Sequence, residues 1–147
     1  MHMKVFIENE AGSTTKNLHN EKTLEFKKSV EVSEPYPYPY GFILDTTSPD
    51  GDNLDCFILT DKQLRCGDIV ECEPIALMRQ MENGIEDFNV VAVLPNSEVG
   101  LTDDVKQELT DFIKNVFRHV AAIKTMTVEG FDDSNAALAY IEAHKDK

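Results

Sequence analysis

The sequence has no tryptophan, only three cysteines among its 147 residues, and no apolar run long enough to cross a bilayer or to act as a signal peptide. Cys56, Cys66 and Cys72 cannot all pair within one chain, and their spacing is that of neither a zinc ribbon nor a CxxC redox motif. We interpret them as free thiols, two of them buried as small hydrophobic residues. These absences predict a cytoplasmic protein without disulfides or a membrane span.

Basic side chains are also scarce, since 14 lysines and arginines stand against 27 aspartates and glutamates, for a net charge of −13. This charge argues against nucleic acid or an anionic membrane as a partner, because both require a basic surface. It suits a site that binds cations, and it also suits a solvated acidic surface that aids solubility. With 41% hydrophobic residues, the chain is predicted to form one globular domain, residues 1–147.

The first two thirds of the chain consist of short segments rich in β-branched and aromatic residues, separated by turn-forming residues. The predicted strands are residues 4–8, 23–28, 41–45, 55–59, 69–78 and 88–94. The segment 35–39 contains three prolines, which lack the N–H that an interior strand needs. We predict a stiff extended connection there that fixes the positions of Tyr36, Tyr38 and Tyr40, with Tyr38 in a structural role.

The last third has helical character. Thr102 is a suitable N-cap, with Asp103 and Asp104 at the positive end of the helix dipole, and apolar residues then recur at helical spacing. A strand at 125–129 and a second helix beginning near Ser134 complete the chain. Short strands followed by helices predict an α+β protein, with a small twisted sheet or barrel and helices packed against its outside.

An acidic cluster is the most informative feature. Asp50, Asp52 and Asp55 lie within six residues around Gly51, directly before a predicted strand. A second acidic pair, Glu82 and Asp87, follows the strand at 69–78. The first cluster does not fit an EF-hand loop, and taken alone it is an ordinary acidic turn. Carboxylates gathered at one place repel each other unless cations separate them, and Mg²⁺ and Mn²⁺ prefer such oxygen ligands.

The residues around these aspartates resemble family I soluble inorganic pyrophosphatases. In that family a segment Tyr-Pro-x-x-Tyr-Gly-x-Ile precedes Asp-Gly-Asp-Pro-x-Asp, and further acidic residues lie in a later loop. The first segment is matched by Tyr36, Pro37, Tyr40, Gly41 and Ile43, and the second by Asp50, Asp52 and Asp55. The register then holds without gaps to Gly67, Pro74, Glu82, Asp87 and residues 90–93. Near the C-terminus, residues 128–131 are similar to the family's Val-Glu-Gly-Trp segment.

The resemblance implies a small OB-like five-stranded closed β-barrel with flanking C-terminal helices. It also implies a homo-oligomer that hydrolyses inorganic pyrophosphate with Mg²⁺, or with Mn²⁺ as the alternative metal. The implied metal ligands are Asp50, Asp52, Asp55, Glu82 and Asp87, with Asp52 as the catalytic carboxylate. The implied substrate-binding residues are Lys16, Lys28, Tyr36, Tyr40, Asn89 and Arg118, and Glu8 lies on the outer side of the site.

Most departures from the family pattern lie on the phosphate-binding side. Lys28 replaces an arginine and cannot form a bidentate contact, and Asn89 replaces a lysine and removes a full positive charge. Phe117-Arg118 replaces a Tyr-Lys pair, which keeps the charge but loses a hydroxyl.

The acidic, metal-binding side of the implied site departs less from the family pattern. Glu82 replaces an aspartate, and Asn53 replaces the proline of the aspartate segment. Lys16 stands for the lysine of an early Lys-x-Glu pair whose glutamate has no secure counterpart here. The basic residues that could compensate on the phosphate side are Lys22, Lys27, Arg79 and Lys124.

Three functions remain open from these residues. The first is a diphosphatase with a reduced rate or an altered metal preference. The second is a catalytically impaired paralogue that binds metal or phosphate, and the third is a hydrolase of another phosphoanhydride. Retention of the carboxylates favours chemistry, whereas Asn89 favours the impaired reading, because one charge-assisted hydrogen bond is worth about 2–4 kcal/mol in a preorganised site.

Overall fold

The computed structural model describes residues 2–120 and 124–147. The strands are β1 (Met3–Asn9), β2 (Thr15–His19), β3 (Phe26–Glu31), β4 (Tyr40–Ile43), β5 (Asp55–Ile58), β6 (Ile69–Glu82), β7 (Ile85–Glu86), β8 (Asn89–Val93) and β9 (Met126–Asp132). The helices are α1 (Asp103–Asn115) and α2 (Ser134–Ala143), and a short 3₁₀ turn η1 (Arg118–Val120) follows α1.

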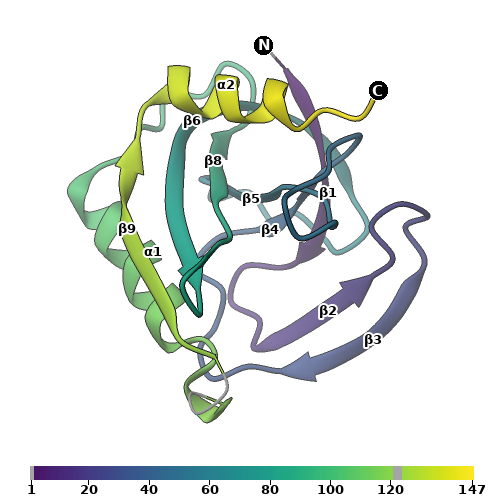
Figure 1. Cartoon of the computed structure of the whole chain (residues 1–147), viewed down its shortest axis with the longest axis vertical. Helices are drawn as coiled ribbons and strands as arrows, with labels where there is room; N and C mark the ends of the chain where they lie inside the picture. Colours follow the sequence, from purple (N-terminus) through teal and green to yellow (C-terminus); the bar gives the residue numbers. More distant parts are fainter. Residues whose placement is uncertain (1, 121–123) are drawn as a thin grey trace.

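Five strands form a ring in the order β1-β4-β5-β8-β6, and β6 pairs with β1 again (Figure 1). The β5–β8 pair is parallel, and the other four pairs of the ring are antiparallel. Strand β6 is long enough to pair with β1 and β8 and then, near its C-terminal end, with β7 and β9. The expected α+β class and the OB-like strand ring are thereby confirmed.

The remaining elements surround this ring. Helix α1 lies beside β9, and α2 crosses one end of the ring close to both termini (Figure 1). The Thr102 hydroxyl caps α1 by accepting a hydrogen bond from the Val105 N–H, as its position in the sequence predicts. Neither helix has the length and apolar character needed to span a membrane, and no other helix among the described residues does.

Side-chain alternation along the ring strands produces two separate apolar cores. Cys56 and Ile58 of β5 belong to one core, which α2 completes with Ala137 and Ile141. Phe57, the residue between them, belongs to the other core, which α1 covers. Because successive strand residues point to opposite faces, β5, β6 and β8 contribute to both cores, whereas the β1 residues Met3, Val5 and Ile7 belong to the first core alone.

Gly41 is required by a close approach of two strands. It pairs with Ile7 of β1, and a Cβ atom at position 41 would lie 1.8 Å from the Phe6 carbonyl oxygen. Any side chain there would therefore push β4 away from β1. The glycine that follows the tyrosine segment thus has a packing role.

The hairpin formed by β2 and β3 differs from the predicted pattern. Residues 23–28 were expected to form a strand, but that strand is Phe26–Glu31, and its partner β2 was not predicted. Every residue of β3 is exposed, and β2 has no apolar alternation. The hairpin lies outside the ring (Figure 1), so burial leaves no pattern in its sequence.

Candidate active site

The loop between β4 and β5 presents Asp50 and Asp52 at its exposed tip. Gly51 has a φ of +94°, a conformation that favours glycine, and two backbone hydrogen bonds close the turn: Ser48 N–H to Asp52 O at 2.6 Å and Gly51 N–H to Ser48 O at 3.0 Å. One carboxylate oxygen of Asp50 accepts the Asp52 N–H at 3.0 Å. The loop therefore holds both aspartates on a short, internally bonded turn. We call residues 44–54 the aspartate loop.

Asp55 and Asn89 lie side by side at the start of two ring strands. They are partners in the parallel pairing of β5 with β8. The next residues on the same strand faces, Phe57 and Val91, belong to the apolar core under α1. The polar site therefore forms the edge of that core, where the strands begin.

The predicted metal ligands influence each other electrostatically. Burial raises the pKa of Asp55 well above its ordinary range, and the charge of Asp87 raises it further. Burial raises the pKa of Asp87 to about 6, and Glu82 and Asp50 contribute to this shift. Asp55, Asp87, Glu82 and Asp50 therefore lie close enough together to disfavour one another's ionisation.

Positive charge among these carboxylates would relieve the repulsion between them, so the donor set fits a hard divalent cation. Within the described residues, no three histidine, cysteine, aspartate or glutamate side chains already stand at chelating distances. One oxygen of Asp50 is also occupied by its own turn.

Lys16 and two tyrosines form the cationic side of the site. Lys16, Tyr36 and Tyr40 line one small pocket, and the Lys16 ammonium lies 5.4 Å from the centre of the Tyr40 ring. Desolvation lowers the pKa of Lys16, but the neighbouring Tyr36 phenol and the Asp55 carboxylate outweigh it, and the net effect is a raised pKa. Lys16 therefore remains a cation next to the acidic residues.

The other predicted cations lie at the periphery. Lys28 is exposed on β3, but it pairs with Leu18, so it shares a hairpin face with Lys16. Arg118 is 63% exposed and forms an ion pair with Glu34. Lys124, one of the suggested compensating residues, lies 3.5 Å from Glu82 and 4.2 Å from the centre of the Phe117 ring. Lys124 thus contacts the acidic half directly.

Two other suggested cations, Arg79 and Lys27, do not contact the predicted metal ligands. Arg79 pairs with Asp132 at 3.2 Å, and Lys27 is exposed on β3. Tyr38 donates a hydrogen bond to Glu108 of α1 at 2.5 Å, in keeping with its predicted structural role.

Glu8 is buried rather than exposed on β1. Its carboxylate accepts the His19 N–H at 3.0 Å, and the same oxygen lies 3.2 Å from His19 Nδ1. Burial raises the pKa of Glu8, whereas Lys16 lowers it. Glu8 therefore links β1 to strand β2, which also carries Lys16.

Two polar residues of the site were not singled out from the sequence. Gln80 of β6 is 5% exposed, donates to the Asp87 carboxylate at 3.0 Å and accepts from the Asn89 amide. Glu21 is half-buried, and its carboxylate accepts the Asn53 N–H at 2.9 Å. Gln80 was detectable as a polar residue within an apolar strand segment, whereas nothing in the sequence near Glu21 marks it.

The raised carboxylate pKa values predict an unusual pH dependence for the metal-free protein. Asp87 has a pKa of about 6, and burial together with Asp52 raises the pKa of Glu21 to about 8. The folded state therefore retains protons that the unfolded chain has lost, and stability falls as the pH rises from 5 to 8. Two shifts of this size correspond to about 5 kcal/mol over this pH range in an unscreened site. Both groups are partly exposed and screened by solvent, so we expect a loss of about 1–3 kcal/mol in the free energy of unfolding.

Urea unfolding in a chelator across this pH range measures the effect. In the double variant Asp87→Asn with Glu21→Gln, the free energy of unfolding should vary less with pH. Divalent metal added to the wild-type protein should restore its stability at pH 8. A metal-free protein whose stability rises from pH 5 to pH 8 would contradict the carboxylate repulsion described above.

The sequence and the fold both match those of known proteins. Residues 5–147 match the family model for inorganic pyrophosphatase. The inorganic pyrophosphatase of Halobacterium salinarum is 33% identical over 120 residues, covering 76% of this chain and 67% of that protein. That of Yersinia pestis is 32% identical over 116 residues, covering 72% and 66%. The chain thus spans about two thirds of the length of these relatives. The structure of inorganic pyrophosphatase from Thermus thermophilus has a TM-score of 0.87 at 27% identity, covering 97% of this chain and 88% of that one.

Proposed function

Because this chain belongs to the inorganic pyrophosphatase family, we propose that it hydrolyses inorganic pyrophosphate to two phosphates by attack of a metal-activated water. The observation that carries the proposal is the gathering of mutually repelling carboxylates, Asp55 and Asp87 among them, opposite the Lys16 ammonium. A purely structural surface gains nothing from such repulsion. A site that binds a cation and a polyanion does gain, because the same carboxylates attract the cation.

The acidic residues perform the metal and proton steps of the proposed reaction. Asp50, Asp52, Asp55, Glu82 and Asp87 would hold the cation. A divalent cation, when bound, supplies positive charge to the phosphate oxygens and lowers the pKa of a water. Asp52, exposed at the tip of the aspartate loop, orients the attacking water and accepts its proton. Asp87 is held in place for this arrangement by the Gln80 amide.

The opposite side of the site binds the two phosphoryl groups. Lys16 and Tyr36 present an ammonium and a hydroxyl to one small pocket, and Tyr40 forms the wall next to Asp55. Lys28 reaches the substrate from the hairpin, and Asn89 offers an amide where a lysine would place a charge. Arg118 acts from the periphery by exchanging its Glu34 partner for phosphate.

The wider assignments follow from the family and are part of the proposal. The metal is Mg²⁺, with Mn²⁺ as the alternative, and the substrate is pyrophosphate. The protein works in the cytoplasm as a homo-oligomer, with residues 1–147 acting as one domain. Three free thiols, two of them buried, are consistent with a reducing compartment.

A phosphate-release assay tests the proposal. Pyrophosphate is supplied with Mg²⁺, with Mn²⁺ or with a chelator, and ATP and tripolyphosphate serve as competing substrates. We expect release from pyrophosphate that depends on metal and is abolished by the chelator. Metal-dependent release from only ATP or tripolyphosphate would instead identify another phosphoanhydride as the substrate. No release with any of the three, in a protein that still binds metal, would identify the impaired paralogue.

A further inference from the structure

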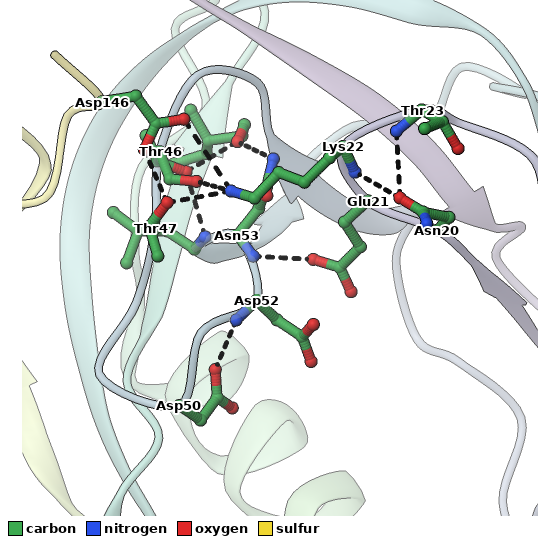
Figure 2. A network of polar contacts seen from close by, with 12 residues as sticks. Asn20, Glu21, Lys22, Thr23, Thr46, Thr47, Asp50, Asp52, Asn53 and Asp146 are labelled. Atoms are coloured by element: carbon green, nitrogen blue, oxygen red, sulfur yellow. Dashed lines mark hydrogen bonds and ion pairs between the residues drawn. The ribbon is translucent and has the colours of Figure 1, made fainter.

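The turn at residues 20–23, between β2 and β3, is hydrogen-bonded to the aspartate loop (Figure 2). Glu21 and Lys22 are an adjacent acid and base, and they bond to opposite ends of the loop. The Glu21 carboxylate accepts the Asn53 N–H at 2.9 Å. The Lys22 ammonium donates to the Thr46 carbonyl at 2.7 Å and to the Thr47 hydroxyl at 2.9 Å.

This turn is itself held in one shape. The side-chain oxygen of Asn20 accepts the N–H groups of both Lys22 and Thr23 at 3.0 Å. Asp146 near the C-terminus reinforces the far end of the contact, accepting a hydrogen bond from the Thr47 hydroxyl at 2.5 Å and lying 3.8 Å from the Lys22 ammonium. The position of Glu21 is therefore determined by the turn and does not depend on chance packing.

Glu21 acts on the backbone between Asp52, at the tip of the aspartate loop, and Asp55, at the start of β5. Asn53 follows Asp52 directly and is 3% exposed, and its side-chain amide donates to the Ile43 carbonyl at 3.0 Å. Its N–H is available only because position 53 is not a proline, the residue present in the segment that the sequence resembles. A hydrogen bond to Glu21 thus restrains the loop where a rigid proline ring would otherwise do so.

We propose that Glu21 is a positioning residue for the active site: by accepting the Asn53 N–H, it holds the aspartate loop in the geometry that aims Asp52 at the metal. Its second carboxylate oxygen points toward Asp52 without contacting the loop backbone (Figure 2). The proposal rests on the pyrophosphatase function only for its kinetic readout.

Metal binding to the full-length protein tests the proposal. Titration calorimetry with Mn²⁺ in the absence of substrate gives the dissociation constant of the site. Glu21→Ala removes the acceptor, and we expect binding about tenfold weaker, the range found when groups that orient metal ligands are lost. Glu21→Gln retains an acceptor oxygen and should remain within about threefold of the wild type. Glu25→Ala removes an exposed carboxylate from the same hairpin and is the matched control.

A double-variant cycle isolates the hydrogen bond itself. Asn53→Pro removes the N–H, so Glu21→Ala should cause no further loss of Mn²⁺ affinity in that background. Thermal unfolding of each variant separates loss of positioning from loss of fold. Equal losses in Glu21→Gln and Glu21→Ala, an undiminished effect of Glu21→Ala in the Asn53→Pro background, or unchanged metal binding in Glu21→Ala would each overturn the proposal.

The kinetic readout separates this proposal from the proposed function. With pyrophosphate as substrate, Glu21→Ala should lower kcat about tenfold at saturating metal, while Glu21→Gln recovers most of the rate. A wild-type protein that releases no phosphate but shows the expected Mn²⁺ affinities would contradict the pyrophosphatase function and leave Glu21 as a positioning residue. If Glu21→Ala kept the full rate of pyrophosphate hydrolysis and an unchanged Mn²⁺ affinity, the pyrophosphatase function would stand and the positioning role of Glu21 would be contradicted.

Discussion

Replacing Asp52 with asparagine should lower kcat for pyrophosphate hydrolysis by about 10²–10³-fold, the range observed when one preorganised group of an active site is removed. The amide is nearly isosteric, but it can neither accept the proton of the attacking water nor contribute a negative charge to a cation. Among the proposed ligands Asp52 is exposed, and its backbone N–H, which Asp50 accepts, is unaffected by the change.

Stability provides the control for this variant. We expect the free energy of unfolding to change by less than about 0.5 kcal/mol, because the side chain is exposed. Asp61→Asn removes an exposed carboxylate that lies beyond the other end of β5 and should leave the rate unchanged. If Asp52→Asn retained more than a third of the wild-type kcat, Asp52 would not be the proton acceptor.

Introducing lysine at Asn89 should raise kcat/KM for pyrophosphate by at least about tenfold. Asn89 is fully buried and pairs in register with Asp55. An ammonium at this position could use the Gln80 carbonyl that now accepts from the Asn89 amide, and it would face the phosphate side of the site. One charge-assisted hydrogen bond in a preorganised site is worth about 2–4 kcal/mol, which is well above the 1.4 kcal/mol that corresponds to tenfold.

Asn89→Met is the matched control, since it supplies comparable length without charge. Steady-state kinetics and the dissociation constant for inorganic phosphate are measured for both variants. We expect lysine to improve both quantities and methionine to improve neither. A lysine variant no faster than the methionine variant would show that the missing charge does not limit the rate, and Lys16 and Lys124 would then account for phosphate binding.

The ring of strands and its helices were largely predictable, because burial leaves a periodic trace. Strands β5 and β8 alternate between two apolar cores, β1 turns its alternate residues to one of them, and the predicted ranges of all three overlap the observed ones. The start of α1 was predictable for a local reason, the Thr102 cap followed by two aspartates. The hairpin of β2 and β3 left no such trace, because β3 is exposed throughout and the partial burial of β2 does not alternate along the strand.

The site divides in the same way. The order of residues already places Asp50, Gly51 and Asp52 in one tight turn, because the conformation that Gly51 adopts is a local property of glycine. Contacts between residues distant in sequence had no such signature. Asp55 meets Asn89 in the parallel pairing of β5 with β8, and Glu21 meets Asn53, 32 residues later in the chain, only because the hairpin folds back over the aspartate loop. Local conformation and periodic burial are therefore encoded in neighbouring residues, whereas the partners that orient the acidic residues are set by the closure of the ring and the return of the hairpin.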